Sequence, residues 1–120
     1  MTKYIQTVVT APVAGQEQEF NHWYDNTHLP EVLALPGFVA AQRYELVGPD
    51  AEERASYLAV YDIETDDIDA TFKALVTGVQ TTMTRTDAMD EQATVVNVYR
   101  VLGERRTAED SAATVGEQGR

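Results

Sequence analysis

The pattern of hydrophobic and polar positions along the chain predicts four short β-strands. They are residues 3–10, which are rich in β-branched and aromatic residues, residues 38–47, whose side chains alternate between two faces, and residues 56–63 and 94–102. Between the first and second strands, and again between the third and fourth, the apolar spacing changes to the three-to-four-residue period of a helix. The predicted order of elements is therefore β-α-β-β-α-β.

Two apolar stripes predict the helices. The first helix is expected to begin at Gln16, and the second at 65–67, where acidic residues favour a helix N-terminus. Each helix buries one side and leaves the other in water. The first stripe consists of Phe20, Trp23, Tyr24 and Thr27, and the second consists of Ile68, Phe72, Leu75, Val76 and Val79.

Pro30 is expected to interrupt the first helix. An interior proline removes a backbone donor, and its ring clashes with the preceding turn. Thr27 can then serve as the N-cap of a second short helix over 28–35, which places Pro30 in a first turn where it is tolerated. His28 would lie at the junction between the two helices.

This order of elements predicts the ferredoxin-like α+β fold, a four-stranded antiparallel sheet with both helices on one face. Apolar residues occur on both faces of the predicted strands, so the face without helices also needs a cover. We therefore expect two copies of the chain to pair sheet to sheet as a homodimer. The domain spans residues 1–103, and residues 104–120, which have almost nothing to bury, are expected to form a flexible tail.

Composition and charge narrow the classes of function. The chain has 120 residues, enough for one domain with its own core. It has no cysteine, which excludes thiolate nucleophiles and iron–sulfur clusters and favours a cytoplasmic location. The net charge of −11 makes nucleic acid and anionic membrane surfaces poor partners. No apolar stretch approaches the ~20 residues that cross a bilayer.

The residues best suited to chemistry lie between Phe20 and Phe38. This stretch holds the only tryptophan and both histidines, and it reads Trp-Tyr-Asp-Asn-Thr-His-Leu-Pro-Glu-Val from position 23 and Leu-Pro-Gly-Phe from position 35. These motifs resemble those of EthD-like proteins in the dimeric α/β-barrel superfamily, over residues 3–102. The resemblance implies a homodimeric barrel in which each subunit keeps a mostly apolar pocket between its helices and sheet. It matches His28 to the family's His-x-Pro element and Tyr24 to the aromatic residue one turn earlier.

His28 is the candidate general acid or base. An imidazole titrates near neutral pH, and partial burial would keep it neutral. Tyr24 could orient a ligand carbonyl through its phenol. The alternatives are that His28 only holds the helix junction on the sheet, and that Tyr24 and Trp23 only fill the core. His22 should face another direction, toward the surface.

Further ligand contacts are expected from the helix and from two strand faces. If those faces look toward the helices, they place hydroxyl and amide groups in an apolar wall, as small-molecule sites commonly do. Neither a metal site nor a cofactor is predicted, because Asp25, His28 and Glu31 are a poor ligand set and the sequence has no glycine-rich phosphate loop. The segment 81–92 gives no clear placement. The candidate contacts are Phe20 and Trp23 of the helix, Gln42 and Tyr44 beside Phe38, and Tyr57 and Tyr61 beside Ala59.

The sequence therefore favours a cofactor-independent enzyme that transfers protons on a small apolar metabolite bearing a carbonyl or a phenol. Dehydratase, cyclase or isomerase chemistry would fit, and the resemblance adds a cofactor-free monooxygenase as an alternative. The competing class is a non-catalytic dimeric protein that binds a small molecule or acts as an accessory protein, in which His28 is structural.

Overall fold

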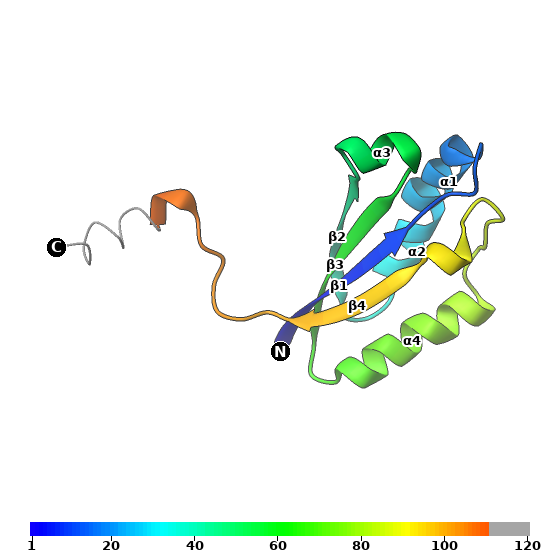
Figure 1. Ribbon diagram of the computed structural model, residues 1–120. Helices are drawn as coiled ribbons and strands as arrows, with labels where there is room; N and C mark the ends of the chain where they lie inside the picture. The colour runs from blue at the N-terminus through cyan, green and yellow to red at the C-terminus, as the bar shows by residue number, and fades with distance from the viewer. Residues whose placement is uncertain (111–120) are drawn as a thin grey trace.

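The computed structural model describes residues 1–110, and their strands form one antiparallel sheet of four strands (Figure 1). The spatial order is β2-β3-β1-β4, with every neighbouring pair antiparallel. This order confirms the predicted ferredoxin-like fold class. The strands are β1 (Thr2–Thr10), β2 (Phe38–Glu45), β3 (Tyr57–Thr65) and β4 (Val95–Arg100).

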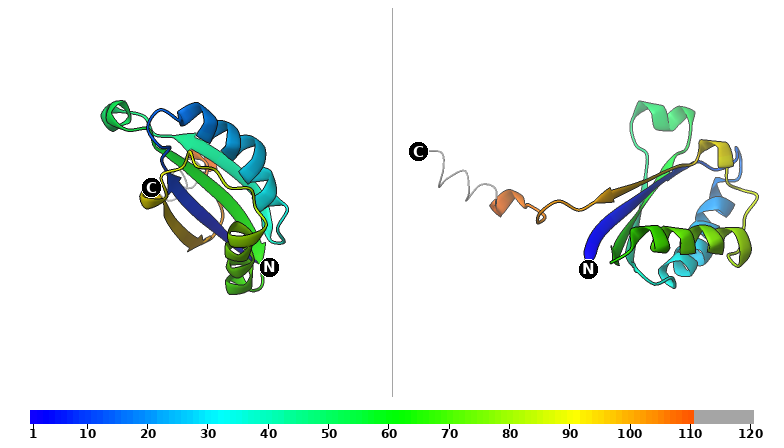
Figure 2. Two further views of the ribbon diagram at one scale, coloured as in Figure 1. Left: turned by 90° about the vertical axis from the view of Figure 1, so that its right-hand side faces the viewer. Right: turned by 90° about the horizontal axis from the view of Figure 1, so that it is seen from below.

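The helical segment between β1 and β2 and the helix after β3 lie on one face of this sheet (Figure 2). Two short helices that were not predicted, α3 and η2, occur in connections; neither buries a residue, so no apolar period marks them in the sequence. The helices are α1 (Glu17–Trp23), the π-helical turn η1 (Tyr24–His28), α2 (Leu29–Leu33), α3 (Pro49–Glu53), α4 (Ile68–Thr81) and the 3-10 turn η2 (Glu91–Ala93).

The first helical segment does not break at Pro30. α1, η1 and α2 follow one another directly, and the N–H of Leu29 bonds to the carbonyl of Tyr24, five residues back. No side chain caps the start of α2, so the predicted break with Thr27 as its N-cap is wrong. The wider π turn before Pro30 gives the proline ring room that a regular turn lacks. His28 therefore lies inside a continuous helix.

β2 is irregular just after Phe38, and this changes which of its side chains face the helices. Strict alternation predicted that Gln42 and Tyr44 share a face with Phe38. That prediction is wrong: Phe38 is buried beneath the helices, but the shifted register turns Arg43 to that side and Gln42 and Tyr44 to the other. A shift of one residue reverses the side to which every later side chain points.

The core lies between the helices and the sheet. β1 and β3 turn alternate residues to this side, so Tyr57 and Tyr61 share the helix-facing side, as expected from their spacing. α4 contacts the core through Thr71, Leu75 and Gly78. The predicted stripe of α4 faces the core only in part, because Phe72, Val76 and Val79 remain 36–38% exposed.

Residues 101–110 leave the body of the domain (Figure 1) and are exposed. The predicted flexible tail covers 104–120, and its part from 111 onward lies outside the described residues. Within 1–110, no helix has the length and apolar character needed to cross a membrane.

Candidate functional site

A cavity of about 200 Å³ lies between the helices and the sheet. β1, β3 and β4 form its floor, and the first helical segment, α4 and the segment after α4 form its walls. A protein cavity of about 150 Å³ holds one benzene molecule, so this cavity has room for one or two fused rings. Its apolar lining includes Val8, Val32, Leu75, Val79, Met83 and Met89.

The cavity brings together four of the residues predicted from the sequence: Trp23, Tyr24, His28 and Tyr61. The His28 ring stacks on the Trp23 indole, with centroids 4.7 Å apart, and meets the Tyr24 ring edge-on at 5.0 Å. The Tyr24 hydroxyl lies 3.1 Å from the Tyr61 hydroxyl. The π turn thus places Tyr24 and His28 on the same side of the helix, one at each end of the turn.

The imidazole of His28 is held in its neutral form. Its Nδ1 atom is buried and has no hydrogen-bond partner among the described residues. Burial lowers the pKa of His28 to about 4, and the nearby carboxylate of Glu31 offsets this only in part. At pH 7 the ring is therefore neutral, with one unprotonated nitrogen.

Tyr24 and Tyr61 form a buried hydroxyl pair. Burial raises the pKa of both phenols, so both are neutral at pH 7. The pair then carries two hydroxyl protons, and only one of them is needed for the hydrogen bond between the two oxygens. The other O–H can be donated to a ligand.

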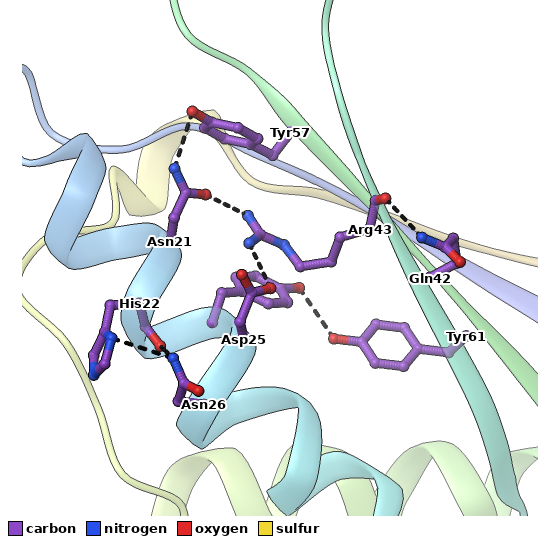
Figure 3. A network of polar contacts seen from close by, with 9 residues as sticks. Asn21, His22, Asp25, Asn26, Gln42, Arg43, Tyr57 and Tyr61 are labelled. Atoms are coloured by element: carbon purple, nitrogen blue, oxygen red, sulfur yellow. Dashed lines mark hydrogen bonds and ion pairs between the residues drawn. The ribbon is translucent and has the colours of Figure 1, made fainter.

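Arg43 reaches from β2 to Asn21 and Asp25 of the first helical segment (Figure 3). Its guanidinium carbon lies 4.4 Å from the centre of the Tyr24 ring. Nη1 of Arg43 donates to Asp25 at 2.9 Å, and Nη2 donates to Asn21 at 2.8 Å. The Asn21 amide in turn donates to the Tyr57 hydroxyl at 3.1 Å. These contacts fix the ring on which the hydroxyl pair depends.

The segment that gave no clear placement in the sequence, 81–92, contributes a wall of the cavity. Trp23 donates its indole N–H to the carbonyl of Thr84 at 3.1 Å. The Glu31 carboxylate accepts the backbone N–H of Thr84 at 3.0 and 3.1 Å. Glu31 thus ties this wall to α2. No three His, Cys, Asp or Glu side chains within residues 1–110 are grouped to hold a metal ion.

The other predicted contacts lie outside the cavity. Phe20 is fully buried in the core, and Tyr57 accepts a hydrogen bond from Asn21. Gln42 and Tyr44 are on the opposite face of the sheet. The exposed His22 pairs with Asn26, as its predicted surface position suggests.

The residue that sequence reasoning missed is Gln6. It lines the cavity and is only 2% exposed, and its Oε1 atom has no hydrogen-bond partner in the described part of the chain. A buried amide without a partner costs free energy unless a ligand or water satisfies it. The sequence does place Gln6 at an inward position of β1, a polar residue that alternates with the apolar Tyr4 and Val8.

Comparison with known proteins gives a family match and a set of related structures. A family model described as "Domain of unknown function (DUF4286)" matches residues 1–86. None of the proteins with curated descriptions matches the sequence.

Among solved structures, the fold is similar to that of an EthD family protein from Bacillus halodurans, with 15% identity and a TM-score of 0.53 over 86% of this chain and 99% of that one. It is also similar to the haem-degrader MhuD of Mycobacterium tuberculosis, with two haems in its active site, at 17% identity and a TM-score of 0.57 over 86% and 99%. A dimeric ferredoxin-like protein from an uncultured marine organism gives 11% identity and a TM-score of 0.58 over 86% and 99%. The resemblance to EthD-like proteins is thus confirmed in the fold.

Proposed function

The chain belongs to the DUF4286 family of domains of unknown function, and we propose that it binds a compact, largely apolar metabolite and transfers protons on it without a cofactor. The metabolite carries a carbonyl or a phenol. The observation that supports this most directly is that one cavity joins a neutral imidazole, His28, to a hydroxyl pair with an O–H to spare.

His28 acts as the base and the hydroxyl pair as the electrostatic partner. The imidazole takes a proton from a carbon next to the ligand carbonyl, and the spare O–H of Tyr24 or Tyr61 donates to the carbonyl oxygen as negative charge develops there. The proton on His28 then returns to another atom of the ligand, which gives an isomer, or it leaves with a ligand hydroxyl as water, which gives a dehydrated product. Both outcomes regenerate the neutral imidazole.

The second candidate is a protein that binds the same kind of molecule without changing it. One observation favours it: burial moves the pKa of His28 to about 4, well below neutral pH, and a catalytic base is strongest when its pKa lies near the working pH. In that case His28 only shapes the cavity, together with the Trp23 ring stacked on it.

Haem does not fit this site. The related MhuD structure contains haem, but a cavity of about 200 Å³ here is far smaller than a macrocycle of four pyrrole rings requires. His28 also has its ring stacked flat on the indole of Trp23 at 4.7 Å. We therefore assign no haem chemistry to the chain.

The active form is proposed to be a homodimer paired through the open face of the sheet. Val9 is 38% exposed and Val95 and Tyr99 are each 52% exposed on that face, an apolar surface that a second sheet would cover. Light scattering at micromolar concentration should give twice the chain mass of 13.3 kDa. A mass of one chain would contradict the dimer.

The test of the function uses 2-tetralone, an uncharged bicyclic ketone with acidic protons next to its carbonyl. Trp23, the only tryptophan, lines the cavity, so its fluorescence reports occupancy. We expect a saturable change in emission and, by proton NMR in heavy water, exchange of the protons beside the carbonyl faster than in buffer alone. Saturable binding without faster exchange would replace the enzyme by the second candidate. An unchanged fluorescence at millimolar ketone would contradict both.

A further inference from the structure

We propose that Gln6 and Tyr61 together select the polar edge of the ligand, so that the cavity prefers an uncharged ring compound in which a carbonyl lies next to an N–H, as in a lactam. This inference rests on the proposed function, because it concerns the same cavity, and it narrows the ligand from any carbonyl compound to one with a donor beside the acceptor.

Gln6 and Tyr61 are direct neighbours across two strands. They pair in the register of β1 and β3, and both side chains point to the helix side. The Cβ atoms of such a pair lie about 5 Å apart. One small ligand can therefore contact both side chains. Both are almost completely buried, with 2% exposure for Gln6 and 1% for Tyr61. Whatever enters the cavity meets the two groups together.

The oxygen of the Gln6 amide lacks a hydrogen-bond donor, and a ligand N–H could supply one. Its Oε1 atom is buried and makes no hydrogen bond to the residues that the structure describes. Rotation about the last side-chain bond is soft, so the amide can turn its oxygen toward a ligand N–H. A purely apolar ligand would leave this oxygen unsatisfied, whereas a ligand N–H next to it would satisfy it.

Tyr61 supplies the complementary donor. Its hydroxyl shares one proton with Tyr24 at 3.1 Å, and the pair keeps a second O–H for an acceptor. A ligand carbonyl would accept that O–H while the neighbouring N–H donates to Gln6. The edge of a lactam has this arrangement, with the acceptor and the donor on adjacent atoms.

The ligand should carry no net charge. Three titratable groups that line the cavity, His28, Tyr24 and Tyr61, are neutral at pH 7, because burial lowers the pKa of the first and raises the pKa of the other two. The charged lining residues Arg85 and Glu91 are exposed to solvent and opposite in sign. An ionic ligand would therefore lose its hydration without gaining a counter-charge.

Two matched compounds test the inference. 2-Quinolone is an uncharged bicyclic lactam of the size of the cavity, and N-methyl-2-quinolone keeps its carbonyl but has no N–H. By titration calorimetry we expect 2-quinolone to bind at least tenfold more tightly, the effect of one hydrogen bond to an otherwise unsatisfied group. Equal affinities would overturn the inference, as would failure of 2-quinolone to bind at millimolar concentration.

The variant Gln6→Leu separates hydrogen bonding from size. It should fold, since an apolar side chain replaces an unsatisfied amide, and the preference for 2-quinolone should fall to within twofold. Thr7→Val, on the opposite face of the same strand, should keep the tenfold preference. If Gln6→Leu still prefers 2-quinolone tenfold, the cavity excludes the methyl group of N-methyl-2-quinolone by its size. Gln6 would then not select the ligand. The proposed function is independent of this result, because 2-tetralone, which has no N–H, tests it.

Discussion

Replacing His28 by glutamine is expected to slow the ligand proton exchange by about a hundredfold or more, the usual contribution of a positioned general base. Glutamine cannot take up the proton, yet it is similar in length and polar, so the cavity keeps its shape. The Trp23 fluorescence titration should therefore give a ligand affinity within a few-fold of that of the unchanged chain. The measurement is the exchange rate of 2-tetralone by NMR at saturating ligand.

The matched control is His22→Gln. His22 lies on the same helical segment but is exposed and hydrogen-bonds to Asn26 instead of lining the cavity. This variant should exchange the ligand at the original rate. Equal exchange rates for the His28 and His22 variants would show that His28 is not the base. The protein would then only bind the ligand.

The burial of His28 can be checked without a ligand. Its pKa of about 4 in the folded chain lies below the ordinary 6.5, so between these pH values the unfolded chain binds more protons. The stability associated with neutral His28 is complete above pH 6.5 and is lost as the pH falls toward 4. Between pH 7 and pH 5 the loss is about 2 kcal/mol. Urea unfolding should show this extra loss relative to His28→Gln, which has no imidazole at position 28 to titrate.

The fold could be predicted because its signals are local and repeated. The four strand-like stretches and the two helical stripes are each long enough to identify an element, and their order is that of a ferredoxin-like fold. Two predictions were wrong because the backbone departs locally from regular helix or strand geometry. Pro30 is tolerated by a π turn, and the irregularity after Phe38 moves Gln42 and Tyr44 to the far face of the sheet. Neither the π turn nor the strand irregularity is marked by the residue types or the hydrophobic spacing, so neither was predicted.

The candidate site was predictable where its residues lie close together in the chain. Trp23, Tyr24 and His28 fall within one helical segment, and they meet at the cavity. The residues that complete the site come from distant elements: Gln6 from the first strand and Thr84 from the segment after α4. Their proximity depends on strand register and on a loop path that a single sequence does not determine.

Replacing Arg43 by alanine is expected to cost about 3 kcal/mol of unfolding free energy. The guanidinium lies 4.4 Å from the Tyr24 ring and 5.2 Å from the Tyr57 ring, and the side chain is only 12% exposed. A desolvated cation over an aromatic face contributes about 2 kcal/mol, and the hydrogen bond to Asn21 adds about 1 kcal/mol. Urea unfolding at pH 7 measures the sum.

The ion pair between Arg43 and Asp25 should contribute little to the unfolding free energy that Arg43→Ala removes. The Asp25 side chain is 56% exposed, and exposed ion pairs contribute about 0–1 kcal/mol, so Asp25→Ala should cost less than 1 kcal/mol. Arg100→Ala is the second control, because Arg100 is exposed and lies 6.0 Å from the Tyr4 ring; it should change stability by less than about 0.5 kcal/mol. If Asp25→Ala were as costly as Arg43→Ala, the arginine would act through its salt bridge. The aromatic rings would then not depend on it, and Tyr24 would keep its position in the cavity without the cation behind it.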